Sequence, residues 1–315
     1  MAIKASGSSV KFNIGIQAAQ GTAATTMQQL KSVTQGETLN SSATELTSAA
    51  ITPIRDVAGI RNGLYSVSGS TGIEISDQGT EIFYQLLLGN KTSVETSAGS
   101  GIFKKTYTRS SNIPYATFER IYSNMSPLQV QLYTDVKINQ IAYTFDPTAL
   151  VTGATDWIGV RSDAETAAIT DTPTVYDHIP FAGIDVNITI NGVATKVLKG
   201  SLTITNALEA SNVLGSQYAD DVVEGLGEVS GSFDMFFTDR TEYDLFNNEA
   251  IFPITITMTK GADTHVFTIP NAKFSGNRDT NVSTDKALVE TYTFKGIQSA
   301  DINGAIKIEV TNATP

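Results

Sequence analysis

Apolar and polar residues alternate along most of the chain with a period of two, which is typical of β-strands. In "SLTITN", Leu202 and Ile204 share one face and hydroxyl side chains occupy the other. The same alternation recurs in "FPITITMTK", "AIKIEVTN" and "LQVQLYTDVKI". The Asn-Gly pairs in "TINGVA" and "DINGAI" are strong hairpin signals. The pattern predicts a mainly β fold whose solvent-facing sides are rich in threonine.

Two short segments have helical spacing instead. "SDQGTEIFYQLLLGN" places apolar residues three and four apart and ends in a glycine stop. "TDRTEYDLFNNEA" places Asp239 three residues before Glu242, the spacing of a capping box. These segments predict short flanking helices at about Thr80–Leu88 and Glu242–Asn248. "TMQQLK" is a third, weaker helical candidate.

The tetrapeptide VSGS occurs twice, each time just before a predicted helix. It begins at Val67 and again at Val229, and the eleven residues from there to Asp77 and Asp239 share five identities. After each helix come a hairpin-like segment and a long strand. This order predicts an internal duplication of one α+β unit; the alternative is two unrelated β-segments that share a Ser-Gly turn. The predicted organisation is an extended N-terminal arm over residues 1–50, a first unit over 51–160, a linker over 161–180 and a second unit over 181–315.

The polar faces of the two repeated strands are small and acidic. A solvent-facing antiparallel sheet accounts for such a face, although small side chains would also leave room beside a passage or a close neighbour. Gly69 and Gly231, in the middle of these strands, predict a bulge or a bend. The polar residues are Ser68, Ser70 and Glu74 in the first strand and Glu228, Ser230, Ser232 and Asp234 in the second.

Composition and charge exclude several classes of protein. A chain of 315 residues with 41% hydrophobic residues can bury a sizeable core. A net charge of −11 argues against a protein that grips nucleic acid by its phosphates, but not against one that lets nucleic acid pass. The chain has no cysteine, which excludes disulfides and thiolate metal sites. No apolar run approaches the roughly 20 residues of a membrane helix or forms a signal peptide, so we expect a soluble protein made in the cytoplasm.

The residue pattern gives little support for catalysis. His178 and His265 are far apart, and neither has a partner histidine at metal-ligand spacing. The sequence has no nucleophile elbow and no glycine-rich phosphate loop. We therefore expect no enzyme activity, no cofactor and no metal. The alternative function is a carbohydrate-binding or adhesive β-module, for which "ADDVV" and "SDQGT" would be poor calcium loops.

Several segments together resemble the long-form tail tube proteins of siphophage-type tailed bacteriophages. They are "IGIQAAQGTAA", "GLYSVSGSTGIEIS" leading into "YQLLLGN", "GEVSGSFDMFFTD" followed by "YDLFNNE", and "FTIPNAKFSG". The likeness extends roughly from Val10 to Asn312 and lies in the order of the segments. It implies a structural virion protein with β-sandwich or half-barrel units, whose inner sheets form a closed barrel when subunits assemble.

The resemblance also implies partners and a location. Tail tube rings usually contain six tube-fold units, so two units per chain would give homotrimeric rings, and one unit per chain would give homohexameric rings. The stacked rings would hold a tape measure protein in the lumen and meet tail terminator and distal tail proteins. Genomic DNA would pass through without specific binding. The protein would be made in the host cytoplasm and reside in the virion tail.

On this interpretation, two sets of residues acquire roles. The acids and hydroxyls of the repeated strands would line the lumen, where they would not attract phosphates; the alternative is that the acids lie on an ordinary outer surface. The basic residues of "FKKTYTR" would meet an acidic neighbour in the next ring; the alternative is a solvated hairpin. The predicted lumen residues are Ser68, Ser70, Glu74, Glu228, Ser230, Ser232 and Asp234, and the predicted inter-ring residues are Lys104, Lys105 and Arg109. Trp157 is expected to anchor a linker between the halves.

Overall fold

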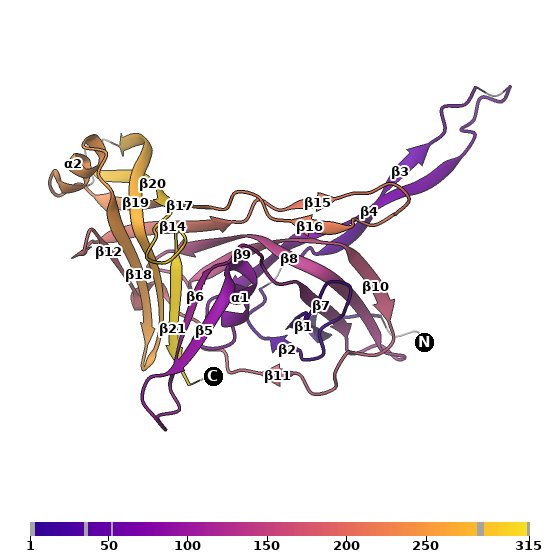
Figure 1. The fold of residues 1–315 in the computed structure, drawn as a ribbon, viewed down its shortest axis with the longest axis horizontal. Coiled ribbons are helices and arrows are strands. Elements are labelled where there is room, and N and C mark those ends of the chain that lie inside the picture. Colours follow the sequence, from indigo (N-terminus) through magenta and orange to yellow (C-terminus); the bar gives the residue numbers. More distant parts are fainter. Residues whose placement is uncertain (1–3, 35–36, 52, 282–286, 314–315) are drawn as a thin grey trace.

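The computed structural model describes residues 4–34, 37–51, 53–281 and 287–313, and most of the chain is β-strand (Figure 1). The earlier strands are β1 (Val10–Ile16), β2 (Gln28–Leu30), β3 (Asn40–Thr47), β4 (Ile60–Glu74), β5 (Gly89–Glu95), β6 (Phe103–Arg109), β7 (Ala116–Tyr122), β8 (Gln129–Phe145), β9 (Thr152–Gly159) and β10 (Arg161–Glu165). The later strands are β11 (Thr174–Val175), β12 (Val186–Ile190), β13 (Val193–Ala194), β14 (Val197–Thr205), β15 (Glu209–Ser211), β16 (Asp221–Val223), β17 (Glu228–Phe236), β18 (Phe252–Lys260), β19 (Asp263–Asn281), β20 (Val289–Ile297) and β21 (Lys307–Asn312).

The described residues include two α-helices, α1 (Glu81–Leu88) and α2 (Thr241–Asn247), and two single 3₁₀ turns, η1 (Gly7–Ser9) and η2 (Gly183–Asp185). The predicted mainly β fold with short flanking helices is confirmed, and each predicted helix is placed to within one residue. The helical candidate "TMQQLK" is wrong, because Gln28–Leu30 forms β2 and pairs with β1.

A long antiparallel sheet runs through eight strands in the order β3-β4-β9-β8-β14-β17-β20-β19. We call it the long sheet. The long strands β8 and β19 each enter it with their second half and contribute their first half to a shorter sheet. In one shorter sheet β8 pairs with β7 and β10; in the other, β19 pairs with β18 and β21. In the described residues, the long sheet does not close on itself within one chain.

The same order of strand pairing occurs twice. The shorter sheets follow the orders β2-β1-β7-β8-β10 and β13-β12-β18-β19-β21. The long sheet repeats as β3-β4-β9-β8 and β14-β17-β20-β19. Register breaks also coincide, between Ala116 and Phe118 of β7 and between Phe252 and Ile254 of β18. Strands β4 and β17, which carry the two VSGS segments, therefore hold the same position in the two sets.

Much of the region predicted as an extended arm, residues 1–50, forms paired strands. Strands β1 and β2 lie beside β7 in a shorter sheet. Strand β3 and the first half of β4 form a hairpin that projects at the upper right of Figure 1. The predicted linker also contains strands, because β10 pairs with β8 and β11 pairs with β2. Trp157 lies in β9 and not in a linker.

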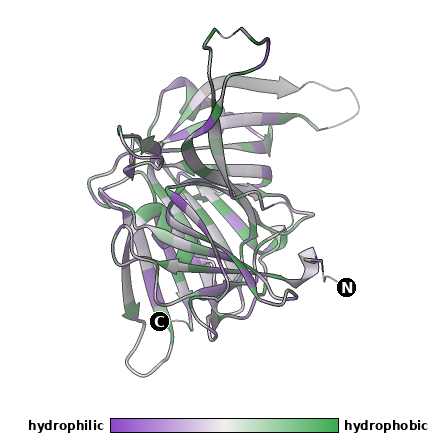
Figure 2. Ribbon diagram, turned by 90° about the vertical axis from the view of Figure 1, so that its right-hand side faces the viewer, coloured by the Kyte–Doolittle hydropathy of each residue, from purple (hydrophilic) through white to green (hydrophobic). Residues whose placement is uncertain are grey.

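One apolar core joins the two sets of strands. Trp157 is buried between Phe118 of a shorter sheet and Phe83 of α1, with ring centroids 6.0 and 6.2 Å away. Tyr84 of α1 packs against Phe267 of β19 in the second set, so this helix contacts both sets. In contrast, α2 has no fully buried residue. Figure 2 shows hydrophobic and hydrophilic positions following one another along the strands, as the sequence pattern predicts.

The VSGS glycines are required because neighbouring backbone passes very close to them. A Cβ atom on Gly69 would lie 2.3 Å from the carbonyl oxygen of Thr38, and one on Gly231 would lie 2.2 Å from that of Ser201. Each glycine also faces an aromatic residue across the sheet, Trp157 or Phe294 respectively. Neither position interrupts the strand register, so the predicted bulge is replaced by a close approach between strands.

We expect Gly231→Ala to destabilise the fold by about 1–3 kcal/mol, because the added methyl group forces apart β14 and β17. Chemical denaturation of the purified protein would measure this change. Gly59→Ala is the matched control, since a Cβ atom there meets nothing within 4 Å. Equal stability of the two variants would contradict the close approach.

Candidate functional site

All seven predicted lumen residues lie on one face of the long sheet. Directly opposed residues in antiparallel strands share a face, and the register can be followed across the sheet from strand to strand. One row begins at Glu74 of β4 and reaches Ser232 of β17 through three intervening strands. This row consists of Glu74, Thr152, Thr144, Ser201, Ser232, Thr293 and Ser275. The parallel row through Ser70 consists of Ser70, Asp156, Gln140, Thr205 and Glu228.

This face, which we call the polar face, has small side chains along its middle. The row between the two just described consists of Gly72, Ala154, Ala142, Thr203 and Ser230, and it continues to Lys295 and Lys273 on β20 and β19. Hydroxyl groups also hydrogen-bond to one another across strands: the Ser201 and Ser232 Oγ atoms lie 2.9 Å apart. Those of Ser42 and Ser66 lie 3.0 Å apart. The middle of this face is therefore a surface of small polar groups.

Most acids of the polar face have nearby partners. Lys295 Nζ lies 2.8 Å from Glu228 Oε1, and the Thr291 hydroxyl donates a hydrogen bond of 2.6 Å to Asp234. His178 Nε2 lies 2.9 Å from Glu74 Oε2. Partial burial raises the pKa of Asp156. The face therefore holds its acids in local contacts and does not present them as a field of free negative charge.

The sequence prediction missed the basic residues of this face. Lys199 lies opposite Asp234, and Lys295 and Lys273 lie opposite each other on β20 and β19. The alternation in "ETYTFKGI" could have placed Lys295 on a polar face, but not next to Glu228. That neighbour follows only from the register between β17 and β20.

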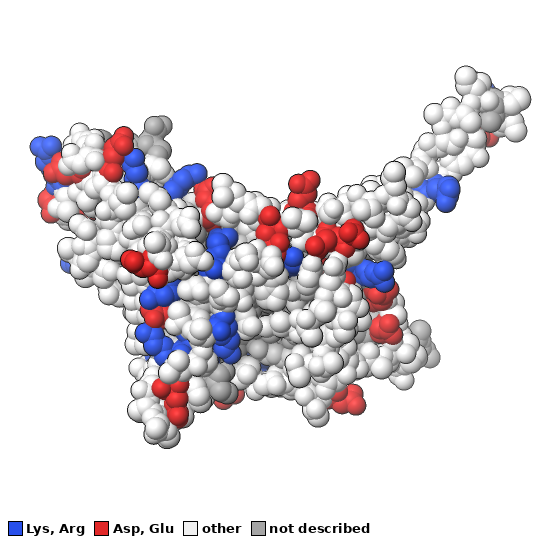
Figure 3. Space-filling view, viewed as in Figure 1, with Lys and Arg blue, Asp and Glu red and all other residues white. Residues whose placement is uncertain are grey.

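The three predicted inter-ring residues occupy different environments. Figure 3 shows Lys and Arg side chains gathered over β5, β6 and β21, with acidic side chains among them. Lys104 is half-exposed and forms an ion pair of 2.8 Å with Glu309. Lys105 is only 2% exposed, so the prediction that it contacts another ring does not fit its position in the core. Arg109 is half-buried and donates a hydrogen bond of 2.8 Å to Asn206, so it connects two parts of the same chain.

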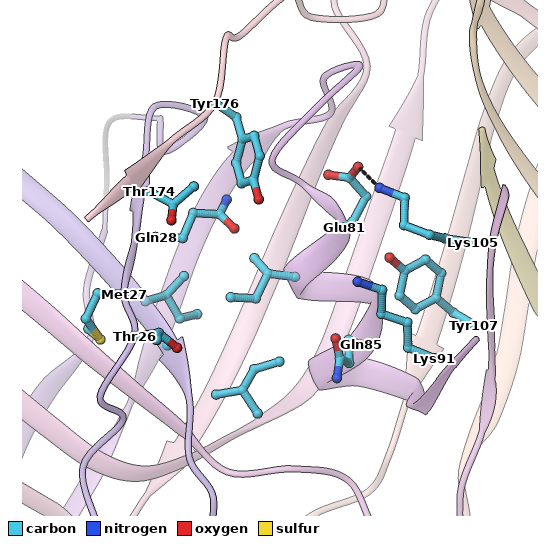
Figure 4. A pocket seen from close by; sticks show the side chains of 14 residues that line it. Thr26, Met27, Gln28, Glu81, Gln85, Lys91, Lys105, Tyr107, Thr174 and Tyr176 are labelled. Atoms are coloured by element: carbon cyan, nitrogen blue, oxygen red, sulfur yellow. Dashed lines mark hydrogen bonds and ion pairs between the residues drawn. The ribbon is translucent and has the colours of Figure 1, made fainter. Parts of the chain in front are cut away.

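A pocket of about 330 Å³ lies between α1 and strands β1, β5 and β6 (Figure 4). Glu81 and Lys105 point toward each other at its wall, with Nζ and Oε1 2.8 Å apart. The Asn312 amide also donates to Glu81, at 2.5 Å. Deeper in the core, the Tyr84 hydroxyl lies 3.0 Å from His265 Nδ1.

At neutral pH these groups keep fixed charges, because their pKa values lie well away from 7. Burial alone would raise the pKa of Glu81, but the charge of Lys105, together with that of His265 when it is protonated at low pH, lowers it to about 2. Burial lowers the pKa of His265 to about 4. Glu81 is therefore ionised and His265 neutral at pH 7. Within the described ranges, no cluster of His, Cys, Asp or Glu is arranged to hold a metal ion.

A family model matches most of the chain. Residues 7–296 match the model of a family described as phage tail tube protein. No curated protein matches the chain. In the part of the chain that the structure describes, no helix is both long enough and apolar enough to span a membrane.

The buried imidazole makes stability sensitive to acid. Because the pKa of His265 is about 4 in the folded protein and near 6.5 when unfolded, the unfolded state takes up more protons between these values. Stability should fall as pH drops from about 6.5 through 4, by up to about 1.4 kcal/mol per pH unit. Thermal unfolding at a series of pH values should show a smaller fall for His265→Gln than for the parent. An unchanged fall in His265→Gln would contradict the assignment.

Proposed function

The chain belongs to the phage tail tube protein family, and we propose that it is the major tail tube subunit, with three copies forming each ring around a channel for the genome. The resemblance seen in the sequence is thus confirmed at the level of the family, and a structural role in the virion tail follows from it. The family match favours this function over a carbohydrate-binding module and over catalysis.

Two tube units per chain are supported by the doubled order of strand pairing. The first would include β1 to β10 and therefore begin near Val10, earlier than residue 51. The second would include β12 to β21, close to the expected range 181–315. A ring of six tube units is complete with three copies of a chain that contains two units.

Closure of the ring is supported by a joint that already exists inside the chain. Residues Gly200–Thr205 of β14 pair with Gln140–Phe145 of β8 and so connect the two halves of the long sheet. In the second set, β19 holds the position of β8, and in the first set, β3 holds the position of β14. The pairing of β19 with β3 of the next copy would continue the sheet and remove both of its edges.

The size of such a barrel suits its function. Three copies of an eight-stranded sheet give 24 strands. With strands about 4.8 Å apart and tilted by about 40°, the backbone ring would be about 40–50 Å across. This leaves room for a DNA duplex, or for a tape measure protein before ejection.

The polar face would be the channel wall. Its hydroxyl groups and internally paired charges offer a passing duplex few free cations, so the counterion release that drives DNA binding would not develop. The apolar side of the same sheet is buried in the core, which leaves this face as the one available to the lumen. Tail terminator and distal tail proteins would meet the two ends of the tube, and Lys104 stays a candidate for contact between rings.

Electron microscopy of assembled protein tests the ring. We expect stacked rings with a central hole and threefold symmetry, in which each chain contributes two similar wedges. Sixfold rings built from six chains would contradict two functional units per chain. Compact monomers under all assembly conditions would contradict the tube function itself.

The channel wall can be tested by reversing its charge. In the parent phage, Glu228→Lys combined with Asp234→Lys should slow DNA ejection, because the new lysines can contact phosphates. Folding should change little, since the ion pair of Glu228 is exposed and such pairs contribute about 0–1 kcal/mol, and Asp234 loses one hydrogen bond at a half-buried position. The control is Asp163→Lys with Glu165→Lys on β10, two exposed residues outside the long sheet. Normal ejection from particles with the double variant would remove these residues from the wall.

A further inference from the structure

We propose that the β3–β4 hairpin of each copy docks on the α2 end of the neighbouring copy whose β19 it pairs with, where Lys273 and Ile297 receive it. This hairpin, the first hairpin, consists of β3 with residues Ile60–Ser68 of β4. The inference rests on the proposed ring but identifies a contact that a ring does not by itself require. Its template is the second hairpin, β15 with β16, which docks on the first set of strands within the same chain.

The internal contact is apolar at its centre. Val222 of the second hairpin is fully buried and belongs to one cluster with Ile113 and Val160 of the first set. Beside it, the rings of Tyr218 and Tyr65 stack with centroids 5.3 Å apart. The second hairpin therefore depends on the first set for its burial.

Lys137 of β8 fixes the edge of this contact. Its Nζ donates a hydrogen bond of 2.8 Å to the carbonyl oxygen of Val222. The same atom lies 2.8 Å from Oε1 of Glu224, just after β16. Only 4% of the Lys137 side chain is exposed. Lys137 on the long sheet thus binds both the backbone and a side chain of the second hairpin.

The two hairpins can be aligned by their sequences. "GLYSVSGS" begins at Gly63 and "GLGEVSGS" begins at Gly225. Counting back three residues from each glycine places Ile60 at the position of Val222. Counting back one places Asn62 at the position of Glu224. Strand pairing supports this, because Ile60 lies opposite Thr47 as Val222 lies opposite Ala210.

The receiving surfaces can be aligned by register. The second residue of VSGS faces Ile158 in the first set and Lys295 in the second. Two residues further on, Val160 in the first set corresponds to Ile297 in the second. Across the next strand pair, Ile158 faces Lys137 and Lys295 faces Lys273. Lys273 thus holds the position of Lys137.

Three positions that are buried in the internal contact correspond to positions that are exposed on the first hairpin and on the α2 end. Val222 is fully buried, whereas Ile60 is 59% exposed. Val160 is 4% exposed and Ile297 is 39% exposed. The side chain of Lys137 is 4% exposed and that of Lys273 is 36% exposed. In a single chain, the first hairpin and the α2 end are therefore both uncovered. A neighbouring copy on each side would cover them.

The receiving surface is also hollowed. A surface pocket of about 500 Å³ lies between the end of α2 and strands β19 and β20, lined by Phe246, Lys273 and Ile297 among others. Lys273 Nζ now lies 2.9 Å from the exposed Glu249. In the docked state it would donate to the carbonyl oxygen of Ile60 and the amide oxygen of Asn62, as Lys137 does to Val222 and Glu224.

Cross-linking of engineered cysteines tests the contact, because the chain has no cysteine of its own. Full-length Ile60→Cys and Ile297→Cys proteins are mixed, assembled and treated with a short bismaleimide. We expect a covalent pair only in the mixture and only after assembly. The control replaces Ile297→Cys with Val193→Cys, which is 64% exposed on β13 and should give no pair with Ile60→Cys.

The outcomes separate this inference from the proposed function. Rings that form without the Ile60–Ile297 cross-link, or with an equal Val193 cross-link, overturn the docking and leave the tube function intact. Failure of the parent protein to form any ring overturns the tube function.

Lys273→Met provides a second test of the docking. It should raise the protein concentration needed for assembly about tenfold while the monomer stays folded, and Lys11→Met, on an exposed part of β1, should leave that concentration unchanged. Equal assembly of the two variants would overturn the role of Lys273.

Discussion

The edge-to-edge pairing of β8 with β14 is the interaction on which the rest of the structure depends. It joins the two sets of strands into one long sheet and so fixes their relative orientation. Asn206, just after β14, secures the corner: its amide donates hydrogen bonds to the carbonyl oxygens of Leu87 and Ile138, and it accepts one from Arg109. Gly227 leaves space for this arrangement, since a Cβ atom there would collide with the guanidinium of Arg109. Helix α1, strand β8 and strand β14 are thus held together by one buried amide.

The consequence of this joint is an asymmetry between the middle and the ends of the chain. Helix α1 is buried where the two sets meet, whereas α2, its counterpart at the far end, is only half-buried. Exposed apolar residues follow the same division: Ile60 and Ile297 stand at the ends, and the corresponding Val222 and Val160 are covered in the middle. A protein that worked as a monomer would have little reason to keep both open surfaces. The pattern fits a chain that continues into copies of itself.

The sequence predicted those parts of the fold that depend on local spacing. The period of two predicted the strands, the apolar spacing predicted α1 and α2, and the VSGS repeat placed seven polar residues on one face. The capping box expected at Asp239 was wrong, because the N-cap of α2 is Arg240 and its side chain makes no capping hydrogen bond. It could not predict partners that are far apart in the chain, because periodicity assigns a face but no neighbour. Lys105 looked like a surface cation in "FKKTYTR" and proved to be a core residue paired with Glu81. Likewise, the neutralisation of Glu228 by Lys295 depends on the register of two strands separated by a helix and a hairpin.

Fusion of two tube units in one chain would change how a ring assembles. Of the six joints between units in a ring, three would lie within chains and form during folding, so only three would depend on encounters between copies. The internal joint also has a feature that the joint between copies would lack: β6, from an added hairpin in the first set, pairs with β21 of the second set. This strand pairing would reinforce the middle of the chain and would give the proposed ring two kinds of joint, one made on folding and one made on assembly. Without an equivalent of the β6–β21 pairing, the second kind would be the weaker one. Subunits would then stay separate until a growing tail offers a ring to join, and the proposed channel wall would run through both kinds of joint without a break.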